Sequence, residues 1–356
     1  MLNWLLVFLP VTAILAYATH VPDSILFISA ALAIVPVAAL IGEATENLSV
    51  HTGPALGGLL NATFGNATEL IIAFFALRAG KIEVVKASIT GSMISNMLLV
   101  LGLALFLGGL KHLKQSFNKE VAGALSSLLI IVMIAFLVPA MLDLTERTGG
   151  VAPARAIAGD ASFALAASFV LIALYVGNLI FSFVTHKDLI SIADEPHEGE
   201  SWPVRRSMAT LAAATIAVAW LSELLVGSLE GFSRQLGLTE VFAGLIIIPI
   251  IGNASEHAAS VFAIKNKLDL TIQIALGATI QIALLVAPVL VIASFLIGQP
   301  MDLVIHRPLE LVGLIGATMI TASVARDGET NWLEGAMLLG VYLLLAIGFF
   351  VLPAGA

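Results

Sequence analysis

Two short polar motifs interrupt a chain that is otherwise largely apolar. Gly-Asn-Ala-Thr-Glu occupies residues 65–69, and Gly-Asn-Ala-Ser-Glu-His occupies residues 252–257. Each motif places a carboxylate, Glu69 or Glu256, inside an apolar stretch, where an unpartnered charge costs about 3 kcal/mol. Two facing carboxylates would repel one another, and either a divalent cation or two protons would neutralise them. A site that holds one or the other is the chemical basis of an exchange reaction.

Oxygen-bearing groups surround both glutamates. Each motif has an asparagine three residues before its glutamate, on nearly the same helix face, and a hydroxyl directly before it. The leading glycines can loosen the helix, so that freed backbone carbonyls point into a cavity. Hard oxygen ligands suit Ca²⁺, whereas zinc and copper fit less well because the chain has no cysteine. The candidate residues are Gly65, Asn66, Thr68, Glu69, Gly252, Asn253, Ser255 and Glu256.

The likeness between the two motifs extends into the segments that flank them. Gly57 aligns with Gly244, and Leu98-Leu99-Val100 aligns with Leu284-Leu285-Val286. Ser95 aligns with Gln281 at matched depth, and Ser92 is close by, so these side chains are candidates for lining the cavity or orienting the carboxylates. A hydroxyl in a membrane helix also commonly bonds to its own backbone, so this alternative stays open for Ser92.

His257 breaks the symmetry, because the first copy has Leu70 at that position. An imidazole beside a membrane glutamate is a candidate proton relay or gate. Its alternative role is a hydrogen bond to a neighbouring helix.

The composition identifies a membrane protein. The 356 residues are 59% hydrophobic and 11% charged, whereas soluble domains have roughly 25% charged residues. The net charge of −8 argues against a nucleic-acid partner. Continuous apolar runs predict helices, since a barrel would show alternating segments of about ten residues. No cofactor is expected, and neither a signal-peptide cleavage site nor an organelle address is recognisable.

We predict an all-α fold with about eleven transmembrane helices in a multi-pass protein of the cell (inner) membrane. The expected organisation is an extra N-terminal helix at 1–22, five-helix repeats at 23–185 and 207–356, and an acidic linker at 186–206. Five spans separate equivalent helices, and this odd number makes the copies enter the bilayer in opposite directions. The apolar segments are 4–19, 24–41, 54–79, 84–108, 120–142, 160–184, 206–228, 241–264, 269–297, 305–324 and 332–352.

The two motifs, read with their flanks, resemble a known family. GNATELIIAFFAL followed by KASITGSMISNMLLVLG is similar to the first α-repeat of the Ca²⁺/H⁺ antiporters, within the Ca²⁺/cation antiporter superfamily. GLIIIPIIGNASEHAASVFAIKNKLDL followed by GATIQIALLVAP is similar to the second. The resemblance implies a cation/proton exchanger, not an enzyme, in which Glu69 and Glu256 carry the cation and the protons. Asn66, Asn253, His257 and Gln281 match polar positions of the family's cavity.

Three other functions remain as alternatives. Na⁺/Ca²⁺ exchange could use the same scaffold, and a cation channel would share the glutamates but would need no proton. An intramembrane hydrolase is disfavoured, because Glu256-His257 lacks the H-E-x-x-H spacing of a metalloprotease. The sequence leaves open the choice among Ca²⁺, Mn²⁺ and other divalent ions, the proton stoichiometry and the oligomeric state.

Overall fold

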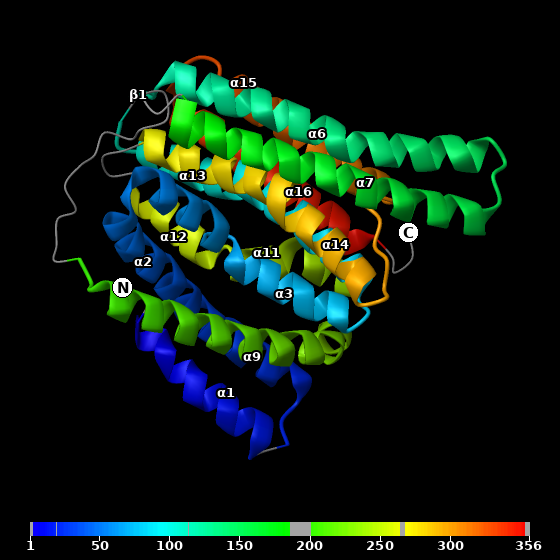
Figure 1. Ribbon diagram of the computed structural model, residues 1–356, viewed down its shortest axis with the longest axis horizontal. Helices are drawn as coiled ribbons and strands as arrows, with labels where there is room; N and C mark the ends of the chain where they lie inside the picture. Colours follow the sequence, from blue (N-terminus) through cyan, green and yellow to red (C-terminus); the bar gives the residue numbers. More distant parts are fainter. Residues whose placement is uncertain (1–2, 19, 113, 186–200, 264–267, 353–356) are drawn as a thin grey trace. The chain divides into compact units, whose positions relative to one another are not determined.

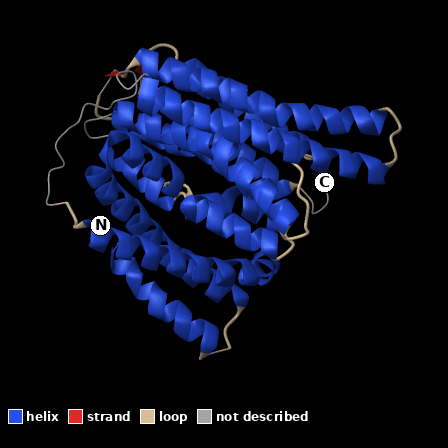
Figure 2. Ribbon diagram, viewed as in Figure 1, coloured by secondary structure: helices blue, strands red, loops and turns tan. Residues whose placement is uncertain are grey.

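The computed structural model describes residues 3–18, 20–112, 114–185, 201–263 and 268–352. Within these ranges the chain is helical apart from turns, loops and one two-residue ladder, in which β1 (Gln115–Ser116) pairs antiparallel with β2 (Glu329–Thr330) (Figure 2). The prediction of an all-α membrane protein is therefore confirmed. Residues 186–200, most of the predicted acidic linker, lie outside the described ranges.

Seven helices in the described part of the chain are long and apolar enough to cross a membrane. Three shorter apolar helices accompany them, and each of the eleven predicted apolar segments contains helix. The long spans are Asp23–Thr52, Ile82–Gly109, Lys119–Thr148, Pro153–Thr185, Val204–Leu236, Leu268–Leu296 and Trp332–Val351, and the shorter ones are Trp4–Tyr17, Glu240–Gly252 and Pro308–Val324.

The chain forms two compact units, each built from separated segments. The first unit contains Met1–Ser88 and Leu179–Glu256, and the second contains Ile89–Asn178 and His257–Ala356. The first unit holds η1 (Asn3–Val7), α1 (Phe8–Tyr17), α2 (Asp23–Phe64), α3 (Ala67–Arg78), the start of α4 (Ile82–Ile94), η3 (Phe181–Thr185), α9 (Val204–Leu236), α10 (Glu240–Phe242), η4 (Ala243–Ile247), α11 (Ile248–Gly252) and the start of α12 (Ala254–Ala263) (Figure 1).

The pairing of α2 with α9 is the main helix contact of the first unit. The rings of Phe27 and Phe232 stack with their centroids 4.0 Å apart. Gly231 of α9 leaves room for the side chain of Asp23 at the start of α2, which any larger residue would displace. These contacts fix α2, the helix that leads into the first polar motif.

Helix α2 bends sharply between residues 49 and 57. A methyl group placed on Gly57 would lie only 2.7 Å from Cβ of Ser49. In a straight helix, residues eight apart are separated by about 12 Å. Pro54 lies in this stretch, and proline removes a helical hydrogen bond and commonly kinks a helix. The bend explains how one 42-residue helix supplies both the second apolar segment and the start of the third.

The second unit packs its helices around small residues. A methyl group on Gly335 would overlap the backbone nitrogen of Phe106, so α5 and α16 approach backbone to backbone. The elements of this unit are the end of α4, η2 (Ser95–Val100), α5 (Leu101–Gly109), β1, α6 (Lys119–Thr148), α7 (Pro153–Ile180), the rest of α12, α13 (Leu268–Gln281), η5 (Ile282–Val286), α14 (Ala287–Leu296), α15 (Pro308–Val324), β2 and α16 (Trp332–Val351).

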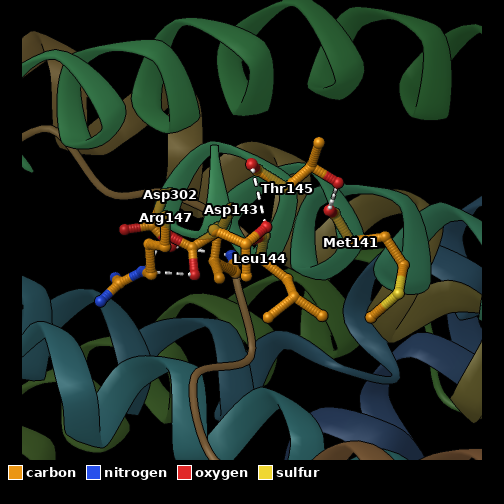
Figure 3. Close-up of polar contacts among 8 residues, drawn as sticks. Met141, Asp143, Leu144, Thr145, Arg147 and Asp302 are labelled. Atoms are coloured by element: carbon orange, nitrogen blue, oxygen red, sulfur yellow. Dashed lines mark hydrogen bonds and ion pairs between the residues drawn. The ribbon is translucent and has the colours of Figure 1, made fainter. Parts of the chain in front are cut away.

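An ion pair lies near the C-terminal end of α6 in the second unit. Arg147 Nε donates to both carboxylate oxygens of Asp143, at 2.6 and 2.8 Å, and Asp302 lies beside the pair (Figure 3). The Asp143 side chain is 10% exposed, whereas that of Arg147 is 57% exposed. Arg147 therefore supplies positive charge to a largely buried carboxylate.

Candidate functional site

Both polar motifs interrupt a helix at the same place. Gly65 and Asn66 separate α2 from α3, and Asn253 separates α11 from α12. Glycine is a poor helix former, and an asparagine side chain competes with the helix for backbone groups. Asn253 does this directly, because its Nδ2 donates to the Pro249 carbonyl at 3.0 Å.

The two glutamates occupy the first turns of the helices that follow these breaks. Glu69 lies in the first turn of α3 and is 8% exposed, and Glu256 lies in the first turn of α12 and is half-buried. The N-terminus of a helix carries a partial positive charge, which stabilises a nearby carboxylate. The sequence therefore places each acid where its own helix favours the charged form.

The two helix breaks lie close together, and each glutamate side chain lies over the glycine of the other motif. A methyl group placed on Gly252 would be 3.2 Å from Cγ of Glu69. A methyl group placed on Gly65 would be 3.7 Å from Oε1 of Glu256. This reciprocal packing brings the two carboxylates into one site, which lies wholly within the first unit.

The carboxylates have little hydrogen-bond compensation within the described part of the chain. Neither oxygen of Glu69 accepts a hydrogen bond there, and Oε2 of Glu256 is also without one. The two groups are close enough for the charge of Glu69 to act on Glu256. Buried carboxylates of this kind require a positive partner, and a metal ion or protons would supply it.

The other motif residues of the first unit are buried or half-buried. Asn66 and Thr68 are 1% and 3% exposed, and Asn253 is fully buried. The side-chain nitrogen Nδ2 of Asn253 donates to the Pro249 carbonyl, so the side-chain oxygen Oδ1 is the atom that Asn253 can offer to a cation. Ser255, on α12, is half-buried.

The remaining predicted site residues belong to the second unit. Ser92 and Ser95 are buried at the end of α4 and the start of η2. Gln281 ends α13, which packs against η2. His257 follows Glu256 in the chain and is half-buried. Their contribution to the cation site stays a prediction.

Sequence reasoning missed one contact of this region. Lys81 is not among the candidate residues of the sequence analysis, yet its Nζ pairs with Glu240 Oε2 at 2.8 Å. The sequence pattern does not single out Glu240, because the aligned residue of the first copy, Gly53, is not an acid. Only the fold brings these two residues together.

The broken helices and the comparison with known proteins both indicate a transporter. Helices broken within an apolar bundle, with ionisable groups at the breaks, are typical of secondary transporters. The chain belongs to the sodium/calcium exchanger protein family, whose model matches residues 23–184 and 206–351.

Individual relatives are similar over nearly the whole chain. A Ca²⁺/H⁺ antiporter of Aphanothece halophytica is 44% identical, and the match covers 98% of this chain and 96% of that protein. The Ca²⁺/H⁺ antiporter ChaA of Bacillus subtilis (strain 168) is 42% identical, with 94% of each chain covered. The solved structure of native YfkE is 39% identical, with a TM-score of 0.84 over 99% of this chain and 100% of that one.

Proposed function

We propose that this protein is a Ca²⁺/H⁺ antiporter, a secondary active transporter that exchanges Ca²⁺ for protons by alternating access. Members of the exchanger family are transporters rather than enzymes. Relatives at 42% and 44% identity that are named Ca²⁺/H⁺ antiporters support this function. The seven long apolar helices of the described residues support a multi-pass membrane protein, and the bacterial relatives favour the cell membrane.

Glu69 and Glu256 are the proposed carriers of both ions. The observation that supports this assignment is their reciprocal packing over Gly252 and Gly65. Two carboxylates at one site bind a doubly charged cation with full charge compensation. Protons bound to the same oxygens remove the charges that the metal needs, so the two ions exclude one another.

The helix breaks supply the other oxygen ligands. Ca²⁺ takes 6–8 oxygen ligands, more than two carboxylates provide. The amide oxygens of Asn66 and Asn253, the hydroxyls of Thr68 and Ser255, and backbone carbonyls at the ends of α2 and α11 are the proposed additions. The C-terminal end of a helix carries a partial negative charge, which also favours a cation.

Charge balance decides which states of the site can move in the proposed cycle. With Ca²⁺ bound, or with both acids protonated, the site is close to neutral and can pass through the apolar bundle. Moving the doubly ionised empty site through the apolar bundle costs free energy, so the site does not return without bound Ca²⁺ or protons. Two carriers give about two protons per Ca²⁺. A third proton, for which His257 is the proposed carrier, would make exchange electrogenic at about 2.3 kcal/mol per charge per 100 mV.

Two alternatives predict different fluxes. A Na⁺/Ca²⁺ exchanger would respond to a sodium gradient, and a channel would conduct Ca²⁺ without a counter-ion. The relatives named for proton exchange favour protons. The cost of the empty ionised site disfavours a channel, because obligatory loading couples the two fluxes.

Purified protein in liposomes tests the proposed function. Vesicles with an acidic lumen are diluted into alkaline buffer containing ⁴⁵Ca²⁺, and a matched set carries an outward Na⁺ gradient at equal pH. We expect uptake driven by the pH jump, collapse of uptake with a protonophore that dissipates the pH gradient, and no uptake driven by Na⁺. Repetition with Mn²⁺ and Mg²⁺ ranks the divalent substrates. Uptake with Na⁺ alone, or uptake that is indifferent to both gradients, would refute proton antiport.

A further inference from the structure

Lys81 and Glu240 form an ion pair that joins the two sequence repeats within the first unit. Their charged atoms are 2.8 Å apart, and their side chains are 21% and 32% exposed. Lys81 lies between α3 and α4, and Glu240 begins α10, whose N-cap is Thr239. The pair therefore connects the end of α3 to the start of the α10–α11 segment, at the ends that lie away from the two breaks.

Close backbone packing lies next to the ion pair. A methyl group placed on Gly244, one turn after Glu240, would lie 3.0 Å from Cβ of Ala87 and 3.1 Å from the carbonyl oxygen of Val84. Only glycine fits this contact without displacing one of the two helices. The α10–α11 segment is thus closed against α4, and the ion pair lies at the edge of the contact.

The first copy of the repeat has the same glycine but not the same ion pair. Gly57 aligns with Gly244, yet the atoms nearest to a methyl group on Gly57 all belong to Ser49 of its own helix. Gly53 aligns with Glu240, so the first copy has no acid at this position. The two copies therefore differ both in packing and in charge.

This difference has an energetic consequence. An inverted repeat can adopt two related states in which the two copies exchange their packing. Interactions that the copies share contribute equally to both states, whereas an interaction found in one copy stabilises one state only. The Lys81–Glu240 pair is an interaction of the second kind.

We propose that the Lys81–Glu240 ion pair is a gate contact, which stabilises the state with the α10–α11 segment packed on α4 and separates once in every transport cycle. This proposal rests on the proposed antiport function. Lys81 and Glu240 act on the bound ion only through the position of α11, so both are positioning residues.

Thiol labelling measures the opening of this contact without any transport assay. The chain has no cysteine, so an introduced cysteine is the only thiol that a maleimide can label. Val84 is 3% exposed, and a cysteine in the Val84→Cys variant, which is smaller than the valine it replaces, reacts with a water-soluble maleimide only when the contact opens. We expect Lys81→Met or Glu240→Gln to raise the labelling rate about two- to fivefold, the usual effect of a partly exposed ion pair. The charge exchange Lys81→Glu with Glu240→Lys should restore slow labelling.

A matched control separates this effect from a general loss of stability. Arg234 and Glu230 form a 2.6 Å ion pair within α9 alone, with side chains 74% and 61% exposed, so Arg234→Met removes an ion pair that does not join the two repeats. Unchanged labelling in both Lys81→Met and Glu240→Gln, or an equal increase in Arg234→Met, would overturn the proposal. Absence of Ca²⁺/H⁺ exchange in the parent protein would refute the proposed function but would leave this labelling result intact.

Cross-linking tests the requirement for opening in each cycle. Lys81→Cys combined with Glu240→Cys is joined by a short bifunctional thiol reagent that contains a reducible disulfide. We expect exchange to fall to the level of empty liposomes and to return after reduction, whereas each single-cysteine variant keeps its exchange activity under the same treatment. Exchange that continues at full rate in the cross-linked protein would overturn the proposal.

Discussion

The side chain of Glu69 lies against the backbone of Gly252, and Glu256 lies in the same way over Gly65. The absence of a side chain at Gly252 allows Glu69 to approach closely, whereas the 3.7 Å separation at Gly65 is an ordinary van der Waals contact. Gly252 is therefore a packing requirement of the site as well as a weak point of the helix. This relationship leads to the first prediction.

Gly252→Ala should weaken Ca²⁺ binding. The new methyl group would stand 3.2 Å from Cγ of Glu69, so the carboxylate must move by a few tenths of an ångström. Overpacking of this kind costs about 1–3 kcal/mol, which corresponds to roughly five- to 150-fold weaker binding. Isothermal titration of the purified protein with Ca²⁺ measures the change.

Gly42→Ala is the matched control for this substitution. Gly42 lies in α2, and a methyl group there meets no atom within 4 Å among the described residues. Alanine is the better helix former, so this variant should keep its Ca²⁺ affinity and gain up to about 1 kcal/mol of stability. Equal losses of affinity in the two variants would show that the Glu69–Gly252 contact has no special role.

Competition at one pair of acids predicts a steep pH dependence of Ca²⁺ binding. As the pH falls, protons occupy the carboxylates that the metal needs, so the apparent Kd rises. When both acids are protonated in the ion-free protein, the logarithm of Kd should change by about two per pH unit, because two protons leave for each Ca²⁺ bound. Titrations over a pH series measure this slope. A slope near one at the acid limit would contradict a two-carboxylate site.

The ion pair at the end of α6 predicts an asymmetric effect on stability. Arg147→Met would leave the largely buried Asp143 without its cation, close to Asp160 and Asp302. An uncompensated buried charge costs more than loss of the whole pair. We therefore expect Arg147→Met to lower the Tm in detergent, and Asp143→Asn in the same background to restore part of the loss. A double variant that is less stable than Arg147→Met would contradict this explanation.

The sequence alone predicts much of this site. The apolar runs locate the spans, and the repeat alignment pairs Glu69 with Glu256 because equivalent residues of two copies occupy equivalent depths. Oxygen-bearing neighbours indicate a hard cation. Both Gly-Asn pairs lie where the helices break, which follows from poor helix propensity inside otherwise continuous apolar segments.

Other features depend on contacts between distant segments and could not be predicted. The sequence predicts two separate spans here, whereas the structure has one continuous helix through residues 23–64 with a bend near Pro54. The pairing of Lys81 with Glu240 depends on how the α10–α11 segment packs on α4, and no local pattern indicates it. Hydropathy identifies the apolar spans, but not which charged residues pair with one another.

Removal of either acid tests the central claim most directly. Glu69→Gln and Glu256→Gln each keep the shape of the side chain and remove one charge. Both variants and Glu120→Gln, a change at the exposed start of α6, are reconstituted at equal density and assayed for pH-jump ⁴⁵Ca²⁺ uptake. We predict uptake at the level of empty liposomes for Glu69→Gln and for Glu256→Gln, with normal uptake for Glu120→Gln. Proton-driven uptake near the parent rate in either site variant would contradict a site in which the two glutamates jointly carry Ca²⁺ and protons.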